Sequence, residues 1–210
     1  MSDFNFKKKY GQNFLVDVNI VNKIVSDIDV LPNSLVIEIG CGDGRLTKVL
    51  CEKFDKVLGY EIDLEVKERL LSNLSCFDNV EVIFDDFLNR NVLDDLSNIS
   101  YEHLYVIANL PYYITTPIIE RLISFDISFE LIRIMVQKEV GDRFCARVGT
   151  KEYGSFTVFL NYNFDVKKNF VVSRNCFFPR PNVDSVIVSL MSKDKLFVSD
   201  KELFYKLVYD

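Results

Sequence analysis

Short apolar runs alternate along the chain with segments of helical periodicity. Apolar residues three and four positions apart predict a helix over residues 17–29, ending before Pro32. The run Leu35–Ile39 is compact and rich in β-branched residues, which is typical of a buried strand. The same patterns then predict a helix at 45–53, a strand at Val57–Ile62 and a helix at Leu64–Leu74.

Further apolar runs continue this alternation. Buried strands are predicted at Val80–Phe84, Leu104–Ala108 and Leu131–Val136, separated by helical or loop segments. The order predicts an α/β fold with a mainly parallel sheet that helices cover on both faces. From Ser155 onward the pattern changes to the strand-like runs Phe156–Leu160 and Val183–Leu190, which predict an antiparallel edge.

Composition excludes several classes of protein. The chain has 210 residues, 49% hydrophobic and 27% charged, which describes a packed domain rather than a disordered or collagen-like chain. Its five cysteines include no Cys-x-x-Cys pair, which argues for free thiols and against a disulfide framework or a zinc ribbon. The single histidine, His103, leaves no histidine-based triad or multi-histidine metal site. No apolar run reaches transmembrane length, so a soluble, cytoplasmic protein without a metal is expected.

The net charge of −6 is unevenly distributed. Residues 1–132 carry 12 Lys and Arg against 22 Asp and Glu, whereas residues 133–180 carry nine against four. This basic block, from Arg133 to Arg180, and the separate Lys7–Lys9 can face an anionic partner. A solvated basic face explains the same charges equally well.

Candidate site residues follow the ends of predicted strands, where open α/β sheets bind ligands. The glycine-rich loop Glu38–Gly44 has GxGxG spacing, unlike the GxGxxG of dinucleotide binders. Glu61 ends the next strand, where a carboxylate can accept both hydroxyls of a ribose. Asp85 and Asp86 end the third strand, where one of them can accept an adenine amine, although a solvated turn suits them too. An adenosine-containing ligand is indicated, and S-adenosylmethionine fits better than NAD because no residue is placed to neutralise a pyrophosphate.

The fourth strand ends in Asn109-Leu110-Pro111-Tyr112, the most specific motif in the chain. An aromatic amine such as adenine N6 is a poor nucleophile because its lone pair is delocalised into the ring. The Asn109 side-chain oxygen and the Leu110 carbonyl can hold both amine hydrogens and favour a pyramidal nitrogen, and Tyr112 offers a face for a flipped base. No general base is required, because the amine loses its proton after attack on the sulfonium carbon. The alternative is an ordinary turn with a core tyrosine.

Taken together, these motifs resemble a known family, the small-subunit ribosomal RNA adenine N6-dimethyltransferases of the KsgA type. The resemblance runs in the family's order from about residue 7 to residue 190. It is carried by Lys8–Leu15, Glu38–Gly44, Glu61, Asp86, Asn109–Tyr112, Gln137–Val140, Tyr153–Ser155 and Phe177–Ser185. Tyr113 and Thr115 depart from the residues that many members carry after the Asn-Leu-Pro-Tyr motif.

The resemblance implies a fold and a site. The fold is a Rossmann-like S-adenosylmethionine-dependent methyltransferase fold, with a mainly parallel seven-stranded sheet and an antiparallel edge. The implied cofactor-binding residues are Gln12, Asn13, Leu15, Gly40, Gly42, Glu61, Asp86 and Asn109. The implied catalytic residues are Asn109, Leu110, Tyr112 and Phe177. Within these sets, Glu61 would take the ribose hydroxyls, Asp86 the cofactor's adenine amine and Asn109 the target amine, with Tyr112 and Phe177 stacking on the base.

The implied function is dimethylation of two adjacent adenosines near the 3′ end of small-subunit ribosomal RNA, by a monomer that acts in ribosome biogenesis. Residues 1–192 are expected to form the methyltransferase domain, and residues 193–210 to begin a truncated helical C-terminal domain with the first residues of a helix at 200–210. Three alternatives stay open: a large-subunit methyltransferase of the macrolide-resistance type, a catalytically silent RNA-binding assembly factor, and a dinucleotide oxidoreductase. The residues Gly11–Leu15 and Gln137–Val140 favour the small-subunit reading over the first of these.

Overall fold

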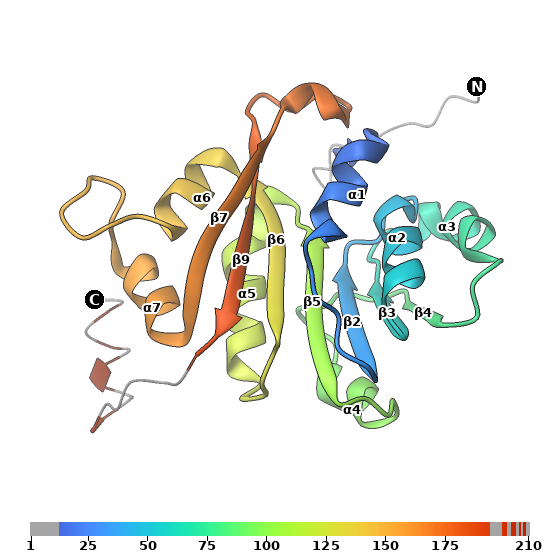
Figure 1. Cartoon of the computed structure of the whole chain (residues 1–210), viewed down its shortest axis with the longest axis horizontal. Helices are drawn as coiled ribbons and strands as arrows, with labels where there is room; N and C mark the ends of the chain where they lie inside the picture. Colours follow the sequence, from blue (N-terminus) through green and yellow to red (C-terminus); the bar gives the residue numbers. More distant parts are fainter. Residues whose placement is uncertain (1–12, 194–198, 201–202, 205, 207, 209–210) are drawn as a thin grey trace.

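A seven-stranded sheet forms the centre of the protein (Figure 1). The structure, a computed structural model, describes residues 13–193, 199, 200, 203, 204, 206 and 208. The strand order is β4-β3-β2-β5-β6-β9-β7. The strands are β2 (Ser34–Ile39), β3 (Lys56–Tyr60), β4 (Val80–Ile83), β5 (His103–Asn109), β6 (Leu131–Gln137), β7 (Phe164–Val172) and β9 (Ser185–Ser192). Strands β2 to β6 are parallel and β9 and β7 complete an antiparallel edge, so the predicted fold class is confirmed.

Helices cover both faces of the sheet (Figure 1). They are α1 (Val18–Ser26), α2 (Arg45–Lys53), α3 (Lys67–Leu74), α4 (Val92–Ser97), α5 (Thr115–Ser124), α6 (Lys138–Phe144) and α7 (Ser155–Asn163). Within β2, Leu35 and Ile37 pack with α4 and α5, whereas Val36 points to the opposite face and packs with α1 and α2. Because both faces are buried, the strands are continuous apolar runs rather than alternating ones. None of the helices in the described part of the chain combines the length and the apolar character needed to cross a membrane.

The crossover between β2 and β5 determines where a ligand can bind. From β2 the chain builds outward through β3 to β4, and it then returns to form β5 on the other side of β2. Ile37 of β2 lies opposite Leu58 of β3 and Val106 of β5, so β2 is hydrogen-bonded on both sides. The loops that follow β2 and β5 leave the sheet in opposite directions, which opens a crevice at the carboxyl ends of these strands.

One predicted strand is a helix. Phe156–Leu160 was expected to form part of the antiparallel edge, but it lies in α7. This helix is buried on several sides, so its sequence lacks the polar face that marks a surface helix, and a short apolar run does not distinguish helix from strand. The strand at the edge is instead β7, where a bulge between Lys168 and Phe170 interrupts the alternation. The expected helix at 200–210 and the expected second domain lie largely outside the described residues.

A second, two-stranded sheet connects distant parts of the chain. Strand β1 (Phe14–Leu15) pairs antiparallel with β8 (Phe177–Phe178). Neither strand was predicted, because two residues are too few to show periodicity.

Arg133 is a buried structural residue rather than part of a basic surface. It lies in β6 and its side chain is 6% exposed. Its guanidinium donates to the carbonyl of Ile24 at 2.7 Å, to the carboxylate of Asp27, and through Nε to Ser189 Oγ at 3.0 Å. The expectation that Arg133 faces an anionic partner is therefore wrong, because the side chain fastens the end of α1 to the sheet.

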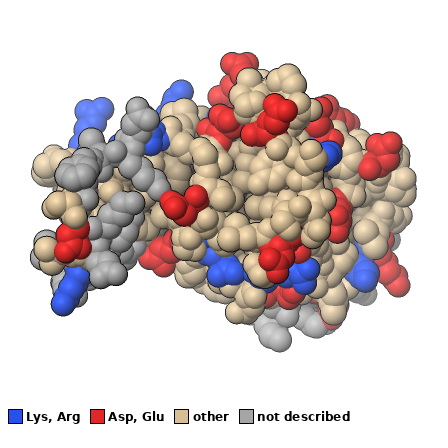
Figure 2. Space-filling view, turned by 90° about the horizontal axis from the view of Figure 1, so that it is seen from below, with Lys and Arg blue, Asp and Glu red and all other residues tan. Residues whose placement is uncertain are grey.

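Other members of the basic block are also neutralised locally. Lys138 and Lys168 both pair with Asp142, the former at 2.8 Å. On the face that Figure 2 shows, basic side chains are interspersed with acidic ones and form no continuous patch. The basic block therefore does not form one uniform surface, because Arg133 is buried and Lys138 and Lys168 are paired with Asp142. Lys7–Lys9 lie outside the described residues.

We expect Asp27→Ala to lower the free energy of unfolding by about 1.5–3 kcal/mol, the usual size of a hydrogen bond to a charged group, because the buried guanidinium loses its carboxylate. Arg133 holds the pKa of Asp27 below its ordinary value of 3.8. The contribution is therefore present above about pH 4 and is lost as the pH falls through the lowered pKa. Urea denaturation at several pH values measures both effects, with the exposed Asp29→Ala as control. Equal stability of the two variants at pH 7 would contradict this role.

Candidate functional site

A cavity of about 230 Å³ opens at the carboxyl ends of β2, β3, β4 and β5. Every predicted site residue that the structure describes lines it: Asn13, Leu15, Gly40, Gly42, Glu61, Asp86, Asn109, Leu110, Tyr112 and Phe177. Gln12 lies outside the described residues. Residues from six separate segments of the sequence thus meet at one site.

The glycine-rich loop after β2 brings the two halves of the cavity together. Gly40 has a φ of +82°, a conformation that favours glycine. Its N–H donates to the Tyr60 carbonyl of β3 at 2.8 Å, while a Cβ at this position would lie 3.8 Å from the Asn109 carbonyl of β5. The loop is therefore hydrogen-bonded to β3 and lies close to the end of β5 at the point where the crevice opens.

Glu61 is a buried carboxylate held in a fixed orientation. It is 4% exposed and follows β3 directly. Its Oε2 accepts the N–H of Gly42 at 2.7 Å, and its Oε1 accepts the N–H of Asp63 at 2.8 Å. Burial raises the pKa of Glu61, whereas these two backbone hydrogen bonds oppose that shift. Each oxygen keeps a second lone pair, so the carboxylate can still accept a pair of ligand hydroxyls.

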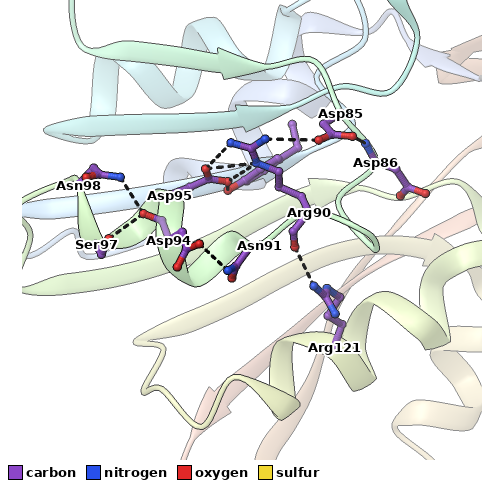
Figure 3. Close-up of polar contacts among 10 residues, drawn as sticks. Asp85, Asp86, Arg90, Asn91, Asp94, Asp95, Ser97, Asn98 and Arg121 are labelled. Atoms are coloured by element: carbon purple, nitrogen blue, oxygen red, sulfur yellow. Dashed lines mark hydrogen bonds and ion pairs between the residues drawn. The ribbon is translucent and has the colours of Figure 1, made fainter.

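The two neighbouring aspartates after β4 are engaged differently, as Figure 3 shows. Asp86 accepts the N–H of Leu88 at 2.9 Å and the side-chain amide of Asn89 at 2.7 Å, both within its own loop. Asp85 forms an ion pair with Arg90 at 3.5 Å and accepts the N–H of Asp86 at 2.8 Å. Both line the cavity, and both carboxylates keep lone pairs that these contacts do not use.

Arg90 fixes this loop to the rest of the fold (Figure 3). Its Nη2 and Nε donate to the carboxylate of Asp95 at 2.8 and 3.0 Å. Its carbonyl accepts from Arg121 of α5 at 2.7 Å. The guanidinium holds the pKa of Asp95 below its ordinary value, and the Tyr60 hydroxyl donates to the same carboxylate at 3.0 Å. The network ties the loop to β3, α4 and α5 without using the carboxylate of Asp86.

The Asn109–Tyr112 turn lies opposite the glycine-rich loop. Asn109 ends β5, and among the described residues none hydrogen-bonds to its side-chain amide, which lines the cavity. Pro111 has φ −57° and directs the chain into a short 3₁₀ turn. The hydroxyls of Tyr112 and Ser185 lie 3.0 Å apart, and burial raises the pKa of Tyr112, so the ring is neutral and held in place. Asn109, Leu110 and Tyr112 of this turn therefore line the same cavity.

Phe177 reaches the site through β8. It is 4% exposed, lines the cavity and lies opposite Leu15 in the β1–β8 ladder. No local pattern marks Phe177 as a site residue, and only the family resemblance singled it out. His103 lies at the start of β5, where its Nδ1 is 2.8 Å from Glu130, and it takes no part in the cavity.

Glu38 is a site residue to which the sequence analysis gave no role. It is 1% exposed, lines the cavity, and its Oε2 has no hydrogen-bond partner among the described residues. Burial, and then the neighbouring Glu61 and Asp43 charges, raise the pKa of Glu38 to about 8. The signal was present in the sequence as one carboxylate at the end of the otherwise apolar run Leu35–Ile39.

An open α/β sheet with a glycine-rich loop after β2 and a buried carboxylate directly after β3 has the architecture of a Rossmann-like fold that binds a nucleoside at the carboxyl ends of its strands. Residues 3–210 match the family model described as "Ribosomal RNA adenine dimethylase". The chain belongs to this family of S-adenosylmethionine-dependent enzymes.

Several known proteins are similar to the chain. A protein of Staphylococcus aureus (strain JH9) named "Ribosomal RNA small subunit methyltransferase A" is 44% identical over 97% of this chain and 70% of its own length. The structure of a dimethyladenosine transferase from Plasmodium falciparum has a TM-score of 0.76 at 32% identity, covering 85% of this chain and 63% of that one. The 23S rRNA methyltransferase ErmE also has a TM-score of 0.76, at 27% identity, covering 94% of this chain and 78% of that one.

We expect Glu38 to make stability fall with rising pH. Because its pKa in the folded state, about 8, lies above its ordinary value of 4.5, the folded protein binds the extra proton between these values. The free energy of unfolding of the wild type, relative to Glu38→Gln, should fall by up to about 1.4 kcal/mol per pH unit across this window. Urea denaturation of both proteins from pH 5 to 8 measures the difference. A difference that does not change with pH would contradict the raised pKa.

Proposed function

We propose that this protein transfers methyl groups from S-adenosylmethionine to the N6 of two adjacent adenosines near the 3′ end of small-subunit ribosomal RNA. The observation that carries the proposal is the Asn109–Tyr112 turn, whose unengaged amide faces the same cavity as the buried carboxylate of Glu61. One cavity can thus hold an adenosine-containing cofactor on the Glu61 side and a target amine on the Asn109 side.

The cofactor side is formed by three strand ends and β1. Glu61 takes the ribose hydroxyls through the lone pairs that its backbone hydrogen bonds leave available. Asp86 takes the adenine amine, and the backbone at Gly40 lies against the methionine part, where a side chain would intrude. Gly42, Asn13, Leu15 and Asn109 contribute the remaining lining. The family resemblance adds Gln12, which lies outside the described residues.

The reaction depends on positioning. S-adenosylmethionine supplies an electrophilic methyl group on a positively charged sulfur. The Asn109 side-chain oxygen and the Leu110 carbonyl accept the two N6 hydrogens, which directs the nitrogen lone pair toward that methyl group. Tyr112 and Phe177 hold the flipped adenine by stacking. The new N–C bond forms as the S–C bond breaks, and the proton then leaves the methylated amine to water.

The identity of the relatives supports the small subunit as the substrate. The S. aureus small-subunit methyltransferase is 44% identical to the chain, whereas the 23S rRNA methyltransferase ErmE is 27% identical. We place the activity in residues 1–192, acting as a monomer on RNA in the cytoplasm during ribosome biogenesis.

Mass spectrometry of methylated subunits tests the proposed substrate. Small ribosomal subunits that lack the modification, and large subunits as a separate substrate, are incubated with the protein and S-adenosylmethionine, and nuclease digests are analysed. We expect dimethyladenosine at two adjacent positions of the small-subunit RNA alone. Methylation of the large-subunit RNA would favour the macrolide-resistance type, and no methylation with a bound cofactor would favour an assembly factor.

Asn109→Ala should leave cofactor affinity within about two-fold and reduce the rate of methyl transfer by about 100-fold or more, the effect of losing one positioned polar group at a reacting centre. Isothermal titration with S-adenosylhomocysteine and a single-turnover transfer assay measure the two quantities. Asn22→Ala, at an exposed position of α1, is the matched control and should retain both. A near wild-type transfer rate in Asn109→Ala would reduce this residue to a turn former.

Glu61→Gln should weaken cofactor binding by about 10- to 150-fold, because the ribose hydroxyls lose a charged acceptor. Isothermal titration with S-adenosylhomocysteine gives the affinity, and the melting temperature shows that the variant is folded. Glu68→Gln changes an exposed carboxylate on α3 and should bind like the wild type. Unchanged affinity of a folded Glu61→Gln variant would remove Glu61 from the cofactor site.

A further inference from the structure

The short β1–β8 sheet is a second link between the cofactor side of the cavity and the side assigned to the target base. Phe14 lies opposite Phe178, and Leu15 lies opposite Phe177. The N–H of Val16 donates to the Cys176 carbonyl at 2.8 Å, which continues the connection past the ladder. Residues about 160 positions apart in the sequence therefore meet at the cavity, which Phe14, Leu15 and Phe177 line.

Strand β1 contacts the cofactor side. The Phe14 ring lies 3.1 Å from the position that a Cβ at Gly42 would occupy, so it packs directly on the glycine-rich loop. The N–H of Gly42 in turn donates to Glu61 at 2.7 Å. A ligand bound by Glu61 and the glycine-rich loop would therefore lie next to the part of the loop against which Phe14 packs.

Strand β8 contacts the side assigned to the target base. Phe177 lines the cavity, and the chain continues from β8 to Ser185, whose hydroxyl lies 3.0 Å from that of Tyr112. Phe178, opposite Phe14, is 57% exposed and so gains little from burial. The ladder to β1 and the packing of Phe177 help to position β8, together with the hydrogen bonds from the Val16 N–H to the Cys176 carbonyl and from Cys176 Sγ to Asp17.

A two-stranded ladder of two residues is not stable by itself in water. The ladder therefore forms only if other residues pack on each strand. Here β1 packs on the cofactor side of the cavity, and β8 packs on the side assigned to the target base. We propose that Phe14 is a positioning residue that couples cofactor occupancy to the placement of Phe177, so that the cofactor and the RNA bind with positive cooperativity. The inference rests on the proposed function for the identity of the second ligand only.

Hydrogen–deuterium exchange tests the link without RNA. S-adenosylhomocysteine, saturating for each variant by its own titration, should slow amide exchange at residues 176–178 of the wild type. Phe14→Ala should abolish this protection, and Phe14→Leu should keep part of it. Phe77→Ala removes another partly buried phenylalanine, outside the cavity, and should behave like the wild type. Unaffected exchange at β8 in the wild type, or equal protection in Phe14→Ala, would overturn the proposal.

Binding of small ribosomal subunits that lack the modification then measures the coupling. In the wild type, saturating S-adenosylhomocysteine should tighten this binding by about five-fold or more, and the subunits should tighten S-adenosylhomocysteine binding by the same factor. The factor should fall toward one in Phe14→Ala even when the cofactor site is saturated, which a merely weakened cofactor site would not produce. An unchanged factor in that variant would contradict the role of Phe14.

The two proposals fail differently. If the subunits do not bind at all but the exchange result holds, the proposed RNA substrate is wrong and the coupling between β1 and β8 stands. If the subunits bind and are methylated but S-adenosylhomocysteine does not change amide exchange at β8, the proposed function stands and the proposed coupling is wrong.

Discussion

The parallel pairing of β2 with β5 is the constraint on which the site depends. It places the ends of two strands side by side while the chain leaves them in opposite directions, and Gly40 brings the β2 loop to within contact of the Asn109 carbonyl. The residues proposed to bind the cofactor follow β2, β3 and β4, whereas the amide proposed for the target belongs to Asn109, the last residue of β5. The transfer distance is therefore determined by the hydrogen-bonded sheet, the most rigid part of the fold, rather than by loops.

The proposed methyl transfer needs almost no titratable side chain near the target amine. The amine needs orientation, not deprotonation, so an amide and a backbone carbonyl suffice, and the one histidine lies elsewhere. The carboxylates gather on the other side, where Glu38 and Glu61 are both buried and both have raised pKa values. A positively charged ligand bound beside Glu38 would favour the ionised form of this carboxylate and so lower its pKa.

The strands of the central sheet could be predicted from the sequence better than the segments that pack around it. Strands such as Leu35–Ile39 were predictable because both faces are buried, and the strand-end residues Glu61 and Asn109 followed from topology alone. Phe177 and β1 could not be derived locally, because their roles depend on a pairing between segments 160 residues apart. The wrong predictions for Phe156–Leu160 and Arg133 share one cause, which is burial. Burial on several sides removes the helical periodicity from the sequence of α7. The sequence likewise does not show that the charge of Arg133 is buried and paired with Asp27.

A crystal structure of the protein with S-adenosylhomocysteine tests the central claim, that one cavity holds the cofactor and the target amine on opposite sides. The account predicts ribose hydroxyls on the carboxylate of Glu61, the adenine beside Asp86, and the sulfur facing the Asn109 amide across the space in front of Tyr112. A sulfur directed away from the Asn109–Tyr112 turn, or a ribose held by residues other than Glu61, would contradict it.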